Sequence, residues 1–206
     1  MKILIGTPTY DGSVYAETSK SIQNLDRGGH DVHWEYVRGY DCARARNILC
    51  QMAIDGKYDY LLMVDADNTL PRDALVNLLQ GDPQICLGYC ARKVTPYAGE
   101  TSIYKLGRSI NFKRENAFRV SELLDLKGAG EKHVPIYGGG AAIMLIRTDV
   151  FRKLDKPYFV WKNYPGGAVL SEDLYFCNQC QVHGIPIFVD CRVGCGHVIK
   201  YVQEAK

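Results

Sequence analysis

Short apolar runs alternate with amphipathic segments along this chain, and the alternation predicts a sheet flanked by helices. The runs that are typical of strands lie at 2–6, 31–37, 60–64, 85–89, 141–146 and 185–190. The segments that are typical of helices lie at 14–25, 43–54 and 71–80, and two more helices begin after Thr148 and Ser171. Because strands and helices alternate, we expect a single α/β domain with a central, mostly parallel sheet and helices on both faces.

The stretch 91–137 interrupts this regularity. It is richer in charge and predicts only short strands, around Ile103 and Phe118. Across all 206 residues, 23% are charged and 47% hydrophobic, which excludes a disordered chain. The longest uncharged apolar stretch, at 141–146, is too short to span a bilayer, so we expect no transmembrane segment. Met1 and Lys2 lead directly into a strand rather than a signal peptide, so we expect a cytoplasmic protein.

The formal net charge of +2 gives no strong case for a nucleic-acid or membrane partner. The chain has eight cysteines, and disulfides are rare in the cytoplasm. A CxxC followed by a CxxxC has the ligand spacing of a structural zinc site. The CxxC pair also falls within a predicted helix, where its two thiols would share a face and simply pack. The four cysteines are Cys177, Cys180, Cys191 and Cys195.

Two aspartates, Asp65 and Asp67, directly follow the apolar run 60–64. Ligands of open α/β sheets bind beyond the carboxyl ends of the strands, and burying unpaired carboxylates there is costly. The pair therefore suits a hard divalent cation that in turn holds the phosphates of a nucleotide. An alternative is that both are loop aspartates that cap the following helix.

Two further segments, 171–173 and 196–197, carry candidate catalytic or metal-binding residues. Ser171, Glu172 and Asp173 open a helix, where a serine cap followed by acids is favourable in itself. A carboxylate at this position, beside a glycine-rich loop, also suits a general base that takes a proton from an acceptor hydroxyl. His197 follows Gly196, and the backbone bend that glycines permit can turn the imidazole toward the metal. A purely structural histidine is the alternative.

Several other segments suit a nucleotide or a sugar. The loop after the first strand can cup a base and ribose, and arginine matches phosphate oxygens. Arg44 and Arg46 are two apart on a helix and cannot point the same way, so at most one contacts phosphate directly. The glycine run 138–140 either lets a ligand approach the backbone or bends the chain before a core strand. The candidates for the nucleotide are Thr7, Pro8, Thr9, Tyr10, Arg44, Arg46, Asn47, Asp65 and Ala66, and those for the sugar or acceptor are Gly138, Gly139, Gly140, Glu172 and Trp161, which lies in the aromatic loop 158–167.

Taken in order, the motifs TPTY, ARARN, LLMVDAD, GGGAAIMLI with RTDVF, SED and GCGH resemble those of the GT-A fold glycosyltransferases. They span nearly the whole chain and are most similar to the large inverting, family 2-like nucleotide-sugar transferases. The resemblance implies a Rossmann-like GT-A domain over 1–206, with a nucleotide-binding half at 1–90 and an acceptor-binding half at 91–206. It also favours Arg46 over Arg44.

The resemblance further implies roles for individual residues. Asp65 would lie near the ribose or the metal, Asp67 and His197 would ligate Mn²⁺ or Mg²⁺, and Asp173 would be the base. The donor would be a nucleotide sugar, with UDP as the expected nucleotide, and the transferred group a hexosyl or pentosyl unit. The acceptor stays open among a glycan, a protein, a lipid and a modified nucleic acid, and so does the oligomeric state.

Two other functions remain open. DADNTL also resembles the first motif of the haloacid-dehalogenase phosphatases, in which Asp65 would be the nucleophile. That motif usually lies on the opening strand, whereas a complete strand–helix–strand unit precedes it here. The chain also fits a module that binds a nucleotide sugar or zinc without turnover.

Overall fold

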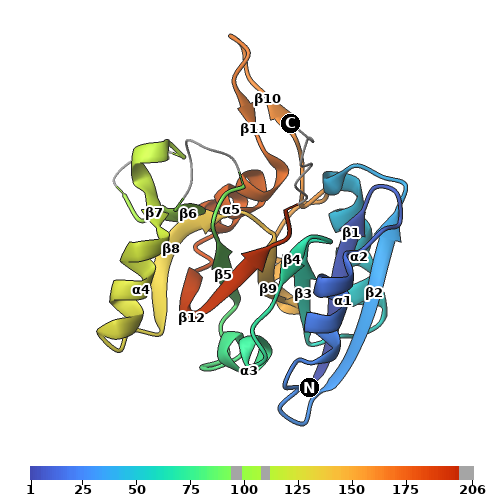
Figure 1. The fold of residues 1–206 in the computed structure, drawn as a ribbon. Coiled ribbons are helices and arrows are strands. Elements are labelled where there is room, and N and C mark those ends of the chain that lie inside the picture. The colour runs from blue at the N-terminus through green and yellow to red at the C-terminus, as the bar shows by residue number, and fades with distance from the viewer. Residues whose placement is uncertain (94–98, 108–111, 200–206) are drawn as a thin grey trace, which may run out of the picture.

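A mixed sheet crosses the molecule in this computed structural model, which describes residues 1–93, 99–107 and 112–199 (Figure 1). Its strands, in spatial order, are β2 (Asp31–Arg38), β1 (Lys2–Thr9), β3 (Tyr60–Val64), β9 (Ile143–Arg147), β5 (Ile85–Cys90), β12 (Ile187–His197), β8 (His133–Gly139), β6 (Glu100–Lys105) and β7 (Ala117–Arg119). The strands β2, β1, β3, β5 and β12 run in one direction, and β9 lies antiparallel between β3 and β5. The predicted α/β fold with a largely parallel central sheet is confirmed.

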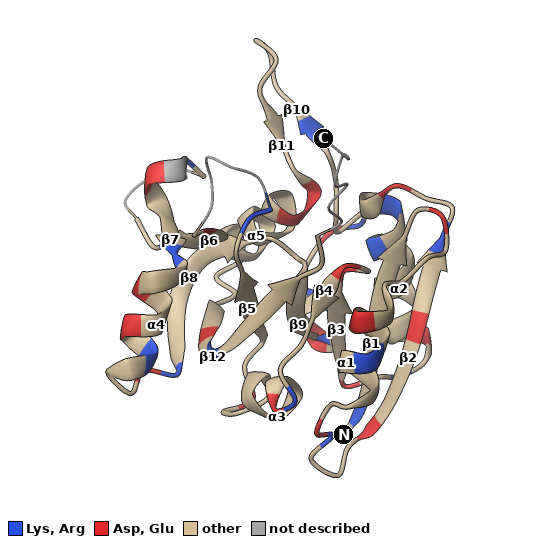
Figure 2. Cartoon of the chain, in the orientation of Figure 1, with Lys and Arg blue, Asp and Glu red and all other residues tan. Residues whose placement is uncertain are grey.

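Helices cover both faces of this sheet because the side chains of a strand alternate between them. In β3, Leu61 and Met63 join the core cluster beneath two helices, whereas Leu62 and Val64 join the cluster beneath two others. The first pair of helices is α2 (Cys42–Asp55) and α5 (Glu172–Val182), and the second is α1 (Ala16–Gln23) and α3 (Ala74–Leu78). The strands β3 and β5 contain no charged residue, and Figure 2 shows them free of charge between charged loops.

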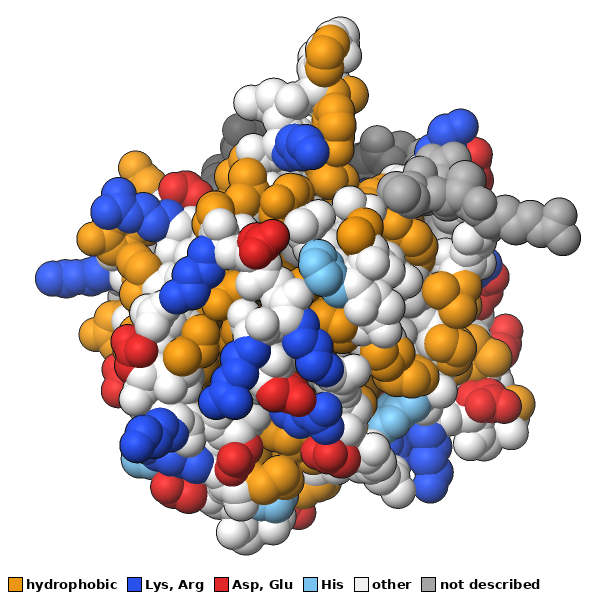
Figure 3. Space-filling model, turned by 180° about the vertical axis from the view of Figure 1, so that it is seen from behind, with side chains coloured by type: hydrophobic (Ala, Val, Ile, Leu, Met, Phe, Trp, Pro, Cys, Tyr) orange, Lys and Arg blue, Asp and Glu red, His pale blue; other side chains and the backbone are white. Residues whose placement is uncertain are grey.

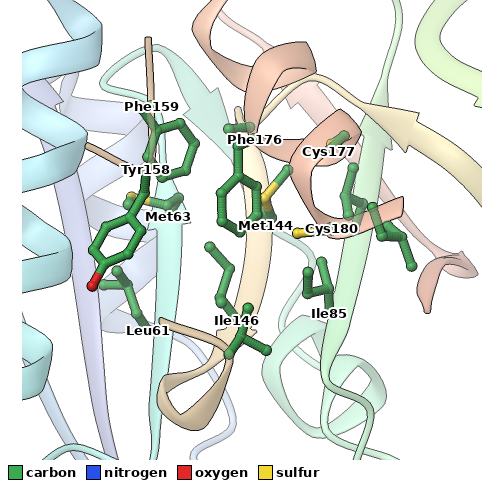
Figure 4. Packing of buried hydrophobic residues seen from close by; sticks show 14 of the residues in the cluster. Leu61, Met63, Ile85, Met144, Ile146, Tyr158, Phe159, Phe176, Cys177 and Cys180 are labelled. Carbon is green, nitrogen blue, oxygen red and sulfur yellow. The ribbon is translucent and has the colours of Figure 1, made fainter. Parts of the chain in front are cut away.

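The larger core cluster holds residues 158–159, which precede the helix α5 that carries Asp173. The rings of Phe159 and Phe176 stack with their centroids 4.6 Å apart and their planes at 11° (Figure 4). The Asn47 side chain accepts a hydrogen bond from the Tyr158 backbone N–H at 2.8 Å and donates one to the Phe159 carbonyl at 2.7 Å. These contacts anchor residues 158–159 to α2 and α5.

A two-residue strand, β4 (Asn68–Thr69), pairs antiparallel with the end of β12. In this register His197 lies opposite Asn68, and Gly196 lies opposite Thr69. A Cβ on residue 196 would lie 2.4 Å from the Thr69 hydroxyl oxygen, so a larger residue there would require the Thr69 side chain to move. The pairing brings the far end of the sequence beside the two aspartates that follow β3.

The structure corrects several predicted boundaries. The loop predicted at 7–12 is instead strand as far as Thr9, because Thr7 to Thr9 pair with β2 and Thr7 accepts a hydrogen bond from the Trp34 indole. The helix predicted at 71–80 is shorter, since α3 contains only Ala74–Leu78. Thr148 opens a 3₁₀ turn (Thr148–Arg152) rather than capping a helix, and its hydroxyl donates to the Tyr58 carbonyl.

The irregular middle of the chain contains more structure than was predicted. The expected strands near Ile103 and Phe118 are β6 and β7, and the helix α4 (Val120–Gly128) and the strand β8 follow them. The aromatic loop holds a hairpin of β10 (Lys162–Asn163) and β11 (Val169–Leu170), which projects from the sheet (Figure 1). Hydrophobic side chains cover part of this projection in the view from behind (Figure 3). Within the described residues, no helix has both the length and the apolarity that crossing a bilayer requires.

Candidate functional site

The turn that carries Asp65 and Asp67 is held by backbone hydrogen bonds. The Asp65 N–H donates to the Ala142 carbonyl at 2.9 Å, and the Asp65 carbonyl accepts from the Asn68 N–H at 3.1 Å. Between them, the Ala66 carbonyl accepts from the Tyr15 N–H at 3.0 Å. The backbone is therefore fixed at the carboxyl end of β3, while the Asp65 and Asp67 side chains stay 30% and 31% exposed.

His197 faces Asp67, with 3.8 Å between its Nε2 and the carboxylate Oδ1. The other ring nitrogen, Nδ1, lies 2.9 Å from the Ala91 carbonyl oxygen, which can only accept a hydrogen bond. In the neutral ring, Nδ1 therefore carries the proton and Nε2 presents a lone pair toward a carboxylate. Two electron-pair donors that face each other suit a cation between them, and a backbone carbonyl on the other nitrogen is typical of metal-bound histidine.

These two residues fit the predicted divalent ion in part. Among the described residues, no group of three or more His, Cys, Asp and Glu side chains is placed to hold a metal. Ions such as Mg²⁺ are commonly held by one or two protein ligands together with water and substrate phosphates. Asp67 and His197 satisfy that pattern, whereas the Asp65 carboxylate is engaged elsewhere.

Asp65 belongs to a buried ion cluster centred on Arg46. The Arg46 guanidinium donates from Nη2 to Asp65 Oδ1 at 2.8 Å and from Nη1 to Glu172 Oε1, and the Arg46 side chain is 4% exposed. Burial raises the pKa of Glu172, and the guanidinium of Arg46 opposes that shift. The cluster links the end of β3 to the first residue of α5. Arg44 points elsewhere, and its guanidinium carbon lies 4.2 Å from the centroid of the Tyr40 ring.

Asp173 lies in the first turn of α5 with its two oxygens in different surroundings. Oδ1 accepts hydrogen bonds from the Ser171 hydroxyl and, at 2.7 Å, from the Leu174 N–H. Ser171 is the N-cap residue as predicted, but its hydroxyl is bonded to this carboxylate rather than to the helix backbone. Oδ2 lies on the side of Gly140, 3.5 Å from the position that a Cβ there would take.

A cavity of about 200 Å³ brings these predicted residues together. Asp65, Asp173 and His197 all line it, although they lie far apart in the sequence. Gly140 lines it as well, whereas the other two glycines of the run are required by packing. A Cβ on Gly138 would lie 2.4 Å from the Cys177 Cβ, and one on Gly139 would lie 2.7 Å from Ile103 Cδ1.

The sequence interpretation missed other residues that line this cavity. Arg92 follows β5, as Asp65 follows β3, so its position after a parallel strand was a usable signal. Its guanidinium donates to the Thr101 carbonyl at 3.2 Å and to the Tyr104 hydroxyl at 2.9 Å. The remaining newly identified lining residues had no signal in the sequence: Gly88, Tyr89, Cys90, Ala91, Ser102, Ile103, Ala142 and Ile143.

The other predicted ligand-binding residues lie outside the described lining of this cavity. Tyr10 is 82% exposed beyond the end of β1, and Asn47 makes the structural hydrogen bonds to residues 158–159. Trp161 is 49% exposed beside the hairpin. Pro8 lies within β1 between Thr7 and Thr9, which are both buried.

The cysteine motif packs as small hydrophobic side chains. Cys177 and Cys180 share the buried face of α5, as the helix prediction implied. Burial raises the pKa of the Cys177 thiol to about 12 and that of Cys191 to about 11. Within the described part of the chain, the four cysteines do not form a metal-binding group.

Comparisons with known proteins rest on structure alone. No protein-family model matches the sequence, and no curated protein matches it either. A protein called A197 from STIV has a similar crystal structure, with a TM-score of 0.64 and 18% identity over 97% of this chain and 87% of that one.

Two further solved structures are similar. GalNAc-T7 with UDP, GalNAc and Mn²⁺ has a TM-score of 0.61 and 11% identity, over 97% of this chain and 44% of that one. S. aureus TarS 1-349 in complex with UDP has a TM-score of 0.51 and 12% identity, over 95% of this chain and 60% of that one. This chain therefore spans less than two thirds of the length of either of those chains. These similarities establish the fold, which is the GT-A-like fold of glycosyltransferases.

Proposed function

We propose that this chain is a metal-dependent glycosyltransferase that moves a sugar from a nucleoside-diphosphate sugar to a hydroxyl acceptor. The observation that carries the proposal is the shared cavity, where Asp65, Asp173 and His197 meet beside Asp67. The GT-A-like fold supports it, and UDP is the proposed nucleotide because two similar structures contain UDP.

Asp67 and His197 are the proposed protein ligands of Mn²⁺ or Mg²⁺. Their facing oxygen and nitrogen atoms support this assignment, as does the carbonyl that fixes the other imidazole nitrogen. When bound, the ion would offset the negative charge that develops on the departing diphosphate. Asp65, held by Arg46 at the end of β3, is proposed to lie near the ribose or the ion.

Asp173 is the proposed general base. Its Oδ1 is held by Ser171 and Leu174, so Oδ2 is the oxygen proposed to accept the proton of the acceptor hydroxyl. The deprotonated oxygen would attack the anomeric carbon from the face opposite the diphosphate, which inverts the configuration. Gly140 leaves the space in front of this carboxylate open. Trp161, which directly precedes the hairpin, is proposed to stack on the sugar.

A screen of nucleotide sugars for metal-dependent hydrolysis tests this proposal without a known acceptor. We expect release of UDP from one UDP-sugar with Mn²⁺, loss of that release with EDTA, and recovery when Mn²⁺ is restored. Release of inorganic phosphate from phosphate monoesters, abolished by Asp65→Asn, would instead indicate the phosphatase. Absence of hydrolysis, together with a raised melting temperature in UDP and Mn²⁺, would indicate a binding module.

A further inference from the structure

The carboxylate of Asp67 is shared between two groups. Its Oδ1 faces His197, and its Oδ2 accepts a hydrogen bond from the Lys93 ammonium. Lys93 lies just beyond β5, three residues after Cys90, on the same edge of the sheet. A positive charge therefore already occupies one oxygen of the proposed metal ligand.

This pair resembles an ordinary surface ion pair in exposure but not in location. Lys93 and Asp67 are 33% and 31% exposed, and the pair Lys105–Glu122 has similar values of 38% and 41%. Lys105 and Glu122 join β6 to α4. Lys93 differs because its partner is the carboxylate that faces the His197 imidazole.

Two cations cannot share this carboxylate without cost. A divalent ion at Asp67 would compete with the ammonium for carboxylate charge and would repel it electrostatically. Asp67 and His197 would hold this ion, and its charge would attract the diphosphate of the donor to the same edge of the sheet. A displaced Lys93 ammonium on its flexible stem would therefore lie within reach of phosphate oxygens.

We propose that Lys93 competes with the divalent ion for Asp67 in the nucleotide-free protein and, once displaced, binds the diphosphate of the donor. This inference rests on the proposed function. The proposal gives Lys93 opposite effects on two affinities. The ammonium weakens binding of the divalent ion when nucleotide is absent, and it strengthens binding of the nucleotide when the ion is present. A lysine that only stabilises the surface would change neither affinity.

Binding measurements on the full chain test the inference without turnover. Mn²⁺ affinity in the absence of nucleotide is measured from the electron paramagnetic resonance signal of free Mn²⁺. UDP affinity is measured by isothermal titration calorimetry in saturating Mn²⁺. The variants are Lys93→Ala and the matched control Lys105→Ala, with Lys93→Arg to retain the positive charge.

We expect Lys93→Ala to bind Mn²⁺ about threefold more tightly, the range that loss of an exposed ion pair allows. The same variant should bind UDP about tenfold more weakly, because a charged hydrogen bond to phosphate is lost. Lys93→Arg should keep both affinities close to those of the wild type, and Lys105→Ala should change neither.

Other outcomes overturn the inference in distinguishable ways. If the wild type binds Mn²⁺ and UDP but Lys93→Ala leaves both affinities unchanged, or weakens both, Lys93 has no such role and the proposed function stands. If the wild type binds neither Mn²⁺ nor UDP, the proposed function and the role of Lys93 are both wrong.

Discussion

The buried Arg46 forms an ion pair with the partly exposed Asp65, with 2.8 Å between Nη2 and Oδ1. The same guanidinium bonds to Glu172, which directly precedes Asp173 in α5. One side chain thus joins the strand end that carries the proposed donor site to the helix that carries the proposed base. This places Arg46 between the two sites, whereas the sequence interpretation placed it on a nucleotide phosphate.

Removing the guanidinium should leave the buried Glu172 carboxylate without its cation, close to Asp65. We expect Arg46→Met to lower the free energy of unfolding by about 3 kcal/mol, the cost typical of breaking a buried ion pair. Adding Glu172→Gln to Arg46→Met should recover part of that loss, because one uncompensated charge is removed. Urea unfolding of both single variants and the double variant measures the coupling, and strictly additive losses would show that the two groups do not interact.

The carboxylate of Asp173 should control the chemical step. We expect Asp173→Asn to lower kcat for transfer by about 10²-fold to 10⁴-fold, the usual contribution of a general base. The affinity for UDP should stay unchanged, because Asp173 is assigned to the acceptor side. Ser171→Ala, which removes one hydrogen bond to Oδ1, is the milder control. If Asp173→Asn retains most of the wild-type kcat, Asp173 is not the general base.

The hairpin tryptophan should contribute to donor binding. We expect Trp161→Ala to raise the KM for the donor by about tenfold, the order expected when an aromatic stacking contact is lost. Val169→Ala is the matched control, because Val169 is an exposed, non-aromatic residue of the same hairpin. Steady-state kinetics of donor hydrolysis provide the measurement. Unchanged KM and kcat values in Trp161→Ala would show that Trp161 does not contribute to donor binding.

A second buried ion cluster should govern stability in acid. Burial of Asp190 by itself would raise its pKa, but hydrogen bonds from His133 and Arg192 outweigh burial and lower the pKa to about 2. A carboxyl group with a lowered folded-state pKa stabilises the protein above its unfolded value near 4, and this contribution is lost as the pH falls toward 2.

We therefore expect Asp190→Asn to lower the free energy of unfolding at pH 7 by about 2 kcal/mol, because the variant lacks the carboxylate charge that His133 and Arg192 stabilise. The difference between wild type and variant should shrink progressively between about pH 4 and pH 2. Urea unfolding at several pH values measures it. A difference that stays constant down to pH 2 would mean that the charge of Asp190 contributes nothing.

Local patterns were enough to predict most of the sheet. The apolar run 60–64 is the strand β3, and Asp65 follows it as expected. The segments missed in the middle of the chain had no such pattern. The strand β8 contains Pro135 and two glycines, which are not typical of a strand. A Cβ at either glycine would collide with Cys177 or Ile103, and only the folded chain brings these residues close.

The local positions of three candidate residues could be predicted, since Asp65 and Asp67 follow a strand and Asp173 lies at a helix start. The contacts between site residues that are distant in the sequence could not be predicted. Nothing local indicates that Arg46 bonds to Glu172, 126 residues later, or that Lys93 bonds to Asp67. The position of His197 depends on the pairing of β4 with β12, and two-residue strands leave almost no periodicity in a sequence.

Whether His197 is bonded to the ion is the most direct test of the account. We expect pulsed electron paramagnetic resonance of the protein with Mn²⁺ and UDP to show nitrogen modulation from a coordinated imidazole. His197→Ala should abolish it, whereas His183→Ala, which alters an exposed histidine at the end of α5, should not. Modulation that survives in His197→Ala, or is absent from the wild type with bound Mn²⁺, would contradict the proposed metal centre.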